Sequence, residues 1–132
     1  MKMATRERMA AWLDGQCERT TVIAPRLVEG SLLYRPVASS GEVEFDFQRA
    51  DMSPKTHLLP ATEVLLQIDK RGSDVQLTEV IPGNEQVLFG VRPCDARGLK
   101  VLDALLVDHE PSDAYYAERR ERTTLILSLI HI

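Results

Sequence analysis

The sequence predicts one α/β domain of the α+β kind, in which an N-terminal helix and short antiparallel strands precede a β-α-α-β unit. Three observations predict it: helical spacing near the N-terminus, alternating β-branched residues after residue 20, and a continuous apolar run before two helical patterns. The chain has 132 residues, of which 44% are hydrophobic and 27% are charged. This composition is typical of one globular domain with one core.

The first half of the chain predicts a helix and then strands. Residues 5–13 place Met9 and Leu13 at helical spacing, and Asp14-Gly15 is expected to end that helix. Three short antiparallel strands are expected to follow, with turns between them at residues 29–30 and 39–41; the strands are residues 21–25, 31–34 and 42–47. In the third strand, alternation predicts one buried face made of Val43, Phe45 and Phe47.

The middle of the chain is harder to assign. Residues 51–60 contain two prolines and predict an ordered loop. Residues 61–68 fit either a helix capped by Thr62 or a strand, and periodicity alone does not decide; we expect a short helix that gives way to a strand. A turn at 71–73, a strand at 75–80 and a turn at 82–84 complete this part.

The last third predicts the β-α-α-β unit. Residues 86–91 form a continuous apolar run, which is typical of a central strand covered on both faces. A helix is expected over residues 96–107, capped by Asp95, with one apolar stripe made of Leu99, Val101, Leu102, Leu105 and Leu106. A helix at 113–121 and a strand at 123–126 follow, and the two strands of the unit should be parallel.

The bulk properties exclude several classes of function. A net charge of −4 and a pI near 5.4 argue against nucleic-acid binding. The sequence has neither a membrane-spanning run nor a signal peptide, so we expect a cytoplasmic protein. Cys17 and Cys94 lie far apart, which favours a thiol or metal-ligand role over a disulfide. Phosphate-binding, dinucleotide, zinc-protease and serine-hydrolase motifs are absent from the sequence, so no catalytic residue is assigned.

The candidate site is the sequence Arg92-Pro93-Cys94-Asp95, which we predict to lie where a buried strand ends and a helix begins. Open α/β sheets bind ligands at that place. The positive end of the helix dipole there favours the thiolate form of a cysteine, which is the form that binds metal or attacks an electrophile. The alternative is that Cys94 is a small half-buried residue, Asp95 a helix cap and Arg92 a surface charge.

Other chemistry-bearing residues give weaker signals. His57 and His109 lie in polar segments without metal-ligand spacing, so we expect both to face solvent. Cys17 follows the predicted end of a helix and has no recognisable role. The alternating charges of residues 118–122 could bind an acidic partner or a phosphate, but they are more typical of a solvated helix face.

Several stretches resemble a known family. They are "VLFGVRPCDARGLKVLD", "DAYYAERRERTTLI", "TVIAPRLVEGSLLYRPV" and "SPKTHLLPATEVLL", and the resemblance covers roughly residues 20–126. Together they are similar to the β subunits of cytoplasmic sulfhydrogenases, the A subunit of anaerobic sulfite reductase, and related proteins with a C-terminal dicluster 4Fe-4S ferredoxin domain. The most specific parts are residues 90–95 and 115–122.

The resemblance implies electron transfer through 4Fe-4S clusters. Family members pass electrons between a flavoprotein NAD(P)H reductase subunit and a hydrogenase or sulfite-reductase-like subunit. It further implies that Cys94 is one cluster ligand, with Arg92 and Asp95 beside it, and that the other ligands come later in the full-length protein. The chain as given is expected to bind no cluster alone, because its one or two thiolates cannot replace four.

The resemblance also implies a domain division. Residues 1–126 would be the N-terminal α/β domain of an iron–sulfur subunit whose ferredoxin-like domain is absent. Residues 127–132 spell a peptide encoded by one frame of a common transposon-end sequencing adapter, so we expect a non-native tail on a fragment. The alternative is an ordinary C-terminal strand.

Two other functions remain open at this stage. The chain could be a thiol-dependent enzyme that uses Cys94 as nucleophile with Asp95 or Arg92 assisting, although the same segment has no histidine to act as base. It could also be a non-catalytic binding module.

Overall fold

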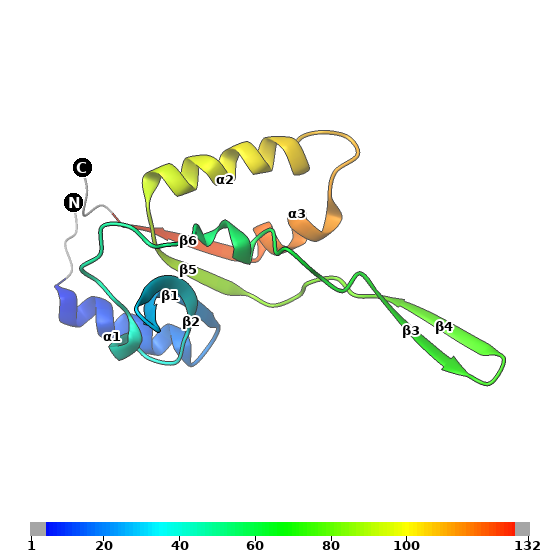
Figure 1. Cartoon of the computed structure of the whole chain (residues 1–132), viewed down its shortest axis with the longest axis horizontal. Helices are drawn as coiled ribbons and strands as arrows, with labels where there is room; N and C mark the ends of the chain where they lie inside the picture. The colour runs from blue at the N-terminus through cyan, green and yellow to red at the C-terminus, as the bar shows by residue number, and fades with distance from the viewer. Residues whose placement is uncertain (1–4, 129–132) are drawn as a thin grey trace.

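A computed structural model describes residues 5–128 as a mixed α+β fold, which confirms the predicted class. Four strands form one sheet in the order β2-β1-β5-β6, and two more form a separate hairpin, β3-β4 (Figure 1). The helices and 3-10 turns are α1 (Arg6–Cys17), η1 (Ser40–Glu42), η2 (Pro54–His57), α2 (Pro93–Leu106) and α3 (Ala114–Glu121). The strands are β1 (Thr21–Val28), β2 (Ser31–Val37), β3 (Leu66–Arg71), β4 (Asp74–Glu79), β5 (Gln86–Val91) and β6 (Thr123–Leu127).

The N-terminal helix and the first hairpin form as predicted, with one difference. Glu29 and Gly30 both have positive φ, 51° and 84°, which is the geometry of a tight turn between twisted strands. Helix α1, however, continues past Asp14-Gly15 to Cys17. Its predicted end was wrong because the Asp14 carboxylate accepts hydrogen bonds from the backbone N–H and hydroxyl of Ser40 instead of terminating the helix.

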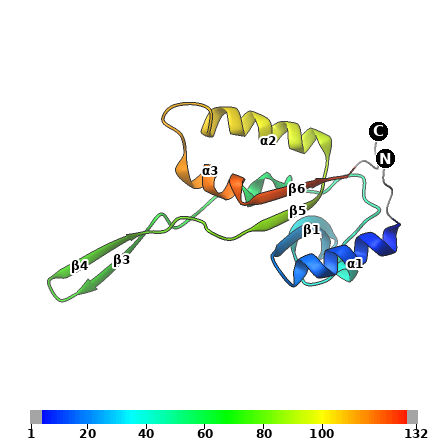
Figure 2. The same cartoon turned by 180° about the vertical axis from the view of Figure 1, so that it is seen from behind.

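Strand β5 is the central strand, as its continuous apolar run predicts. It pairs in parallel with β1 on one side and β6 on the other. One face of the sheet packs against α2, α3 and η2; the buried residues are Ile23, Tyr34, Leu58, Leu88, Val91, Leu99 and Tyr116. The other face packs against α1; the buried residues are Leu13, Val22, Ala24, Val37, Val43 and Val87. Helices α1 and α2 therefore cover opposite faces (Figure 2).

A bulge at Gly90 sets the path by which the chain leaves β5. The register with β6 shifts between Phe89 and Val91, and Gly90 has a φ of 77°. The Gly90 carbonyl accepts a hydrogen bond of 2.9 Å from the hydroxyl of Tyr34. Burial raises the pKa of Tyr34 to about 12. A Cβ at Gly90 would lie 3.4 Å from the Pro25 ring, so both the positive φ and the close approach favour glycine.

The predicted third strand at residues 42–47 does not form. The segment lies against the α1 face of the sheet, where Val43 and Phe45 join the core, and does not pair with the outer edge of β2. It makes one backbone hydrogen bond to the sheet, of 2.8 Å, from the Glu44 N–H to the Pro25 carbonyl. Its apolar side chains still point inward: Val43 is buried, and Phe45 packs edge-on against Phe89.

The helix expected after residue 61 is also absent. Residues 61–65 form a bend and an irregular segment that leads into the β3-β4 hairpin, whose turn and second strand agree with the predictions. Thr62 therefore caps nothing. A helix here would need the Leu65 carbonyl for its own backbone bonds. That carbonyl instead accepts hydrogen bonds from the Val80 N–H at 2.9 Å and from the Tyr115 hydroxyl at 3.3 Å. Residues 82–84, predicted as a turn, form an irregular connection without a defined turn.

The β-α-α-β unit forms as predicted, but α2 begins earlier than expected. Proline at the first helical position starts the helix at Pro93, so Arg92 is the N-cap and Asp95 lies in the first turn. The predicted single apolar stripe divides into two. Leu99 is buried and Leu102 half-buried, whereas Val101 and Leu105 are 60% and 63% exposed on the outer face.

Replacing Gly90 by alanine should destabilise the fold, because it forces a side chain into a positive φ and against Pro25. We expect the free energy of unfolding to fall by about 1–3 kcal/mol in chemical denaturation. The control is Gly15→Ala, at a helical glycine whose added Cβ would meet nothing within 4 Å. It should raise stability by about 0.5–1 kcal/mol, and equal effects of the two changes would contradict the bulge's role.

Candidate functional site

Cys94 lies at the carboxyl end of β5, in the first turn of α2, as the sequence predicts. Its side chain is exposed, and its thiol forms no hydrogen bond within residues 5–128. It borders a cavity of about 290 Å³, whose other lining residues are Ser53, Lys55, Asp95, Gly98 and Leu102. The alternative that Cys94 is a small half-buried residue is therefore wrong. Its sulfur is accessible to a ligand.

Asp95 connects the two segments that flank Cys94. Its carboxylate accepts from Arg92 Nε at 3.2 Å and from the Ser53 hydroxyl at 3.0 Å. The bond to Asp95 is the main cause of a raised pKa for Arg92. Asp95 therefore acts as a clamp between the η2 loop and the start of α2, which is a different role from the predicted helix cap. Ser53 was not singled out from sequence, although it belongs to one of the stretches that carry the resemblance.

Two polar side chains of α3, those of Tyr116 and Arg120, turn inward. Tyr116, which is 1% exposed, donates from its hydroxyl to Asp103 at 2.7 Å, and Arg120 Nε donates to the same carboxylate at 3.1 Å. Burial is the main cause of a raised pKa for Tyr116. The expectation of a solvated face over residues 118–122 is thus wrong for Arg120, because its partner lies on α2.

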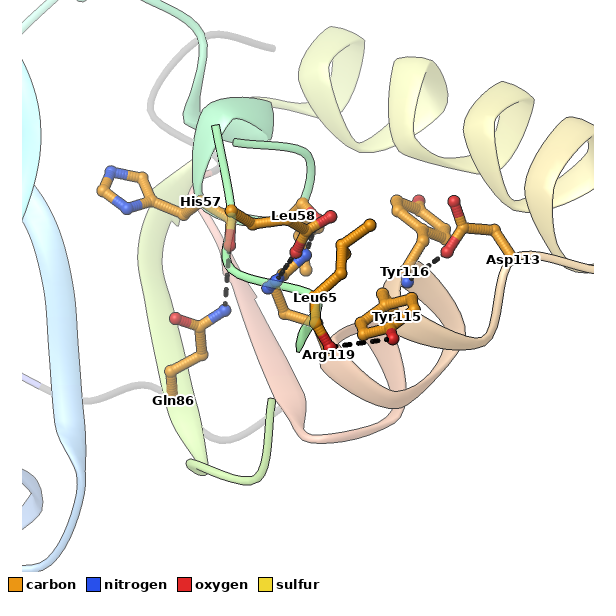
Figure 3. Close-up of polar contacts among 9 residues, drawn as sticks. His57, Leu58, Leu65, Gln86, Asp113, Tyr115, Tyr116 and Arg119 are labelled. Atoms are coloured by element: carbon orange, nitrogen blue, oxygen red, sulfur yellow. Dashed lines mark hydrogen bonds and ion pairs between the residues drawn. The ribbon is translucent and has the colours of Figure 1, made fainter. Parts of the chain in front are cut away.

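Arg119 ties α3 to the loop that follows η2. Its guanidinium donates to the Leu58 carbonyl at 2.9 Å and pairs with Glu63 at 2.5 Å (Figure 3). Nearby, the Gln86 side chain donates to the His57 carbonyl at 3.4 Å, which ties the same loop to β5. Arg119 and Gln86 therefore hold the loop, β5 and α3 together.

The two histidines differ in their surroundings. His109 is exposed, as expected, and contacts the neighbouring Glu110 carbonyl. His57 is half-buried, so its predicted solvent-facing position is wrong. Its Nε2–H donates to the Tyr34 carbonyl at 2.9 Å, and burial lowers its pKa. The buried Leu58 that follows draws this segment against the sheet, which local polarity could not reveal.

The two cysteines lie at opposite ends of the central strands of the sheet. Cys17, near the end of α1, lines a hollow beside Thr20 and Glu85, where β1 and β5 begin. It is half-buried, it packs against the α1 face of the core, and burial raises its pKa. Cys94 follows the other end of β5, so the two thiols do not converge on one site.

Known proteins offer one informative comparison. No family model matches the chain, and no solved structure matches it. Sulfhydrogenase 2 subunit beta of Pyrococcus furiosus is 31% identical over 93 residues. The chain resembles one region of a hydrogenase subunit. The matched residues are 70% of this chain and 26% of that protein, so the chain spans about a quarter of the length of the curated relative it matches.

The match supports the relation to sulfhydrogenase β subunits inferred from the quoted motifs. The relation to sulfite reductase subunits and the site roles of Cys94, Arg92 and Asp95 stay predictions. None of the helices within residues 5–128 is long and apolar enough to cross a membrane.

A complete 4Fe-4S site is not formed by the described residues. Such a cluster is bound by four ligands, usually cysteine thiolates. Over residues 5–128, no group of three or more His, Cys, Asp or Glu side chains is placed to hold a metal ion. Cys94 fits the requirements for one ligand, because it is exposed at a helix N-terminus, but not for the whole set.

Replacing Arg119 by methionine should destabilise the chain, because the Leu58 carbonyl and the Glu63 carboxylate lose their donor. We expect a loss of about 1–3 kcal/mol in the free energy of unfolding, measured by urea denaturation. Arg97→Met is the matched control, since Arg97 is exposed on α2. A loss no larger than that of the control would show that the bonds of Arg119 do not stabilise the fold.

Stability should depend on the ionisation of His57. Because its pKa is lowered in the folded chain, the unfolded chain binds a proton more readily, and stability falls as the pH drops below about 6.5. The decrease stops growing once the pH passes below the folded-state pKa. Urea denaturation at about pH 7.5 and about pH 5.5 should show a smaller decrease for His57→Gln than for the unmodified chain. Equal decreases would contradict the assignment.

Proposed function

We propose that this chain is part of an electron-transfer, iron–sulfur subunit of a hydrogenase- or sulfite-reductase-like complex. In this proposal Cys94 supplies one ligand of a 4Fe-4S cluster, and Arg92 and Asp95 set the charge and hydrogen bonding around it. The subunit would carry electrons and perform no bond chemistry of its own, so catalysis would belong to partner subunits.

The position of Cys94 is the observation that carries the proposal. It combines an exposed thiol, a helix N-terminus and the end of a strand buried on both faces. Backbone N–H groups at a helix N-terminus can stabilise a negatively charged cluster. The clamp of Asp95 with Arg92 and Ser53 keeps that turn in place without using the sulfur.

The outer face of α2 supports a further domain over this site. Cys94, Val101 and Leu105 are spaced so that they lie along one side of the helix, and all three are exposed. Apolar residues on that side are best explained by a cover, because the inner stripe already packs on the sheet. We propose that a ferredoxin-like domain, carrying the remaining ligands, lies against this face in a longer protein.

The partners follow from the same proposal. The relative's name describes it as a sulfhydrogenase subunit, which implies that it works in an assembly. We propose a flavoprotein NAD(P)H reductase subunit as electron donor or acceptor on one side and a hydrogenase or sulfite-reductase-like subunit on the other, in the cytoplasm. Residues 1–126 would form the N-terminal α/β domain. Residues 127–132 would be a non-native tail, of which residues 129–132 lie outside the described part of the chain.

The thiol-enzyme alternative has less support. A nucleophilic cysteine needs a neighbouring base. Within the described chain, the His57 ring bonds to the Tyr34 carbonyl and the His109 ring to the Glu110 carbonyl, and neither bonds to Cys94.

The test is to recover the genomic continuation past residue 126 and to express the longer protein without oxygen. We expect iron, acid-labile sulfide and a low-temperature electron paramagnetic resonance signal. Cys94→Ser should remove the iron and sulfide of one cluster, because the ligand set loses a thiolate. The 132-residue chain alone should bind none.

Cys17→Ser is the matched control, since Cys17 lies near the start of β5, at the opposite end of that strand from Cys94. It should leave iron, sulfide and the resonance signal unchanged. A native stop codon after residue 132 with no iron in the protein would contradict the proposal. Full iron content in the Cys94→Ser protein would contradict the role of Cys94 while leaving the electron-transfer role standing.

A further inference from the structure

The β3-β4 hairpin has one apolar face and one polar face. Its cross-strand pairs are Leu66 with Glu79, Ile68 with Leu77, and Lys70 with Val75 on one face. The other face carries only polar side chains, namely Gln67, Asp69, Arg71, Asp74, Gln76 and Thr78. Because side chains alternate across a strand, this separation is a property of the sequence and not of one rotamer choice.

The apolar face is not covered within the described chain. Leu66, Ile68, Val75 and Leu77 are 55%, 64%, 52% and 63% exposed. The hairpin projects away from the sheet and its helices (Figures 1 and 2). A lone two-stranded hairpin is marginally stable in water, and apolar patches of this kind mark interaction sites. We therefore expect this face to pack against another apolar surface.

The base of the hairpin is anchored, so its direction is defined. The Tyr115 hydroxyl donates to the Leu65 carbonyl at 3.3 Å and to Glu79 Oε1 at 2.9 Å. These bonds connect the hairpin to α3 and leave Glu79 Oε2 without a hydrogen bond inside residues 5–128. Lys70, near the tip, forms no ion pair within the same residues.

We propose that this face binds the same face of a second copy of the chain, with the two hairpins stacked antiparallel about a two-fold axis. Centring the stack on the Ile68–Leu77 pair sets the tip of each hairpin over the base of the other. The row that holds Lys70 in one copy then faces the row that holds Glu79 in its partner. The face is therefore apolar at its centre, and its charges complement those of the same face on a second copy. An isologous dimer interface requires such self-complementarity.

The exposed area suits such a dimer. Val64 and Ile81 continue the apolar surface at the base and are 65% and 51% exposed. With the four apolar residues of the face, six side chains at roughly 100 Å² each give about 600 Å² per copy. Two copies would bury about 1,200 Å², which is the lower limit for specific interfaces. Because the two chains extend from opposite ends of the stack, their sheets and helices stay apart.

The test is sedimentation of the 132-residue chain over a concentration range. We expect a reversible dimer of about twice 14.8 kDa. Ile68→Lys and Leu77→Lys should each raise the dimer Kd by at least about tenfold, since both residues lie at the centre of the interface. The matched control is Gln76→Lys, which adds the same charge on the polar face and should leave the Kd unchanged. All three positions are exposed, so the monomer fold should persist, as circular dichroism can check.

A charge exchange tests the stacking direction. Lys70→Glu places like charges together and should weaken the dimer, and so should Glu79→Lys. The double variant Lys70→Glu with Glu79→Lys restores opposite charges and should recover most of the lost affinity. Recovery supports the antiparallel stack, and failure to recover contradicts it.

Other results would overturn the proposal. A chain that stays monomeric at about 0.1 mM contradicts it, because a specific interface of this size should hold at that concentration. A dimer that resists Ile68→Lys and Leu77→Lys uses a different surface. Binding of the hairpin only to an added hydrogenase-type subunit would assign the face to a heterologous partner. The iron content of a longer protein tests the proposed function separately and is independent of these outcomes.

Discussion

Parallel pairing of β5 with both β1 and β6 is the constraint on which the rest of the structure depends. A strand paired at both edges and buried on both faces needs cover above and below. Helix α1 supplies one layer, and α2, α3 and η2 supply the other. The Gly90 bulge then redirects the chain at the end of β5, so that Arg92-Pro93 can start a helix directly at the sheet edge. Cys94 is exposed at that edge as a consequence of this geometry.

Sequence patterns predicted the elements whose cause is local. The run at residues 86–91, the Glu29-Gly30 turn and the helix at residues 113–121 each contain their own signal, and each is confirmed. Residues 42–47 alternate like a strand, but their apolar side chains pack on the α1 face of the sheet and the segment pairs with no strand within residues 5–128. Such failures share one cause: the deciding partner is distant in sequence.

The candidate site divides in the same way. The place of Cys94 at the strand end followed from local pattern, and the structure agrees. The clamp between Asp95 and Ser53 spans 42 positions in sequence and the bond from Arg119 to Leu58 spans 61, so neither could be inferred from spacing. Of these two bonds only the clamp to Ser53 lies beside Cys94, at the carboxyl end of β5, and it leaves the thiol accessible.

We propose above that the Cys94 sulfur bonds iron in a longer form of this protein. The most direct measurement is a crystal structure of that protein, grown without oxygen, with anomalous diffraction recorded at the iron absorption edge. We expect an iron peak within bonding distance of Cys94 Sγ, beside the N-terminus of α2. Iron peaks whose ligands all come from other cysteines, with Cys94 Sγ away from them, would contradict it.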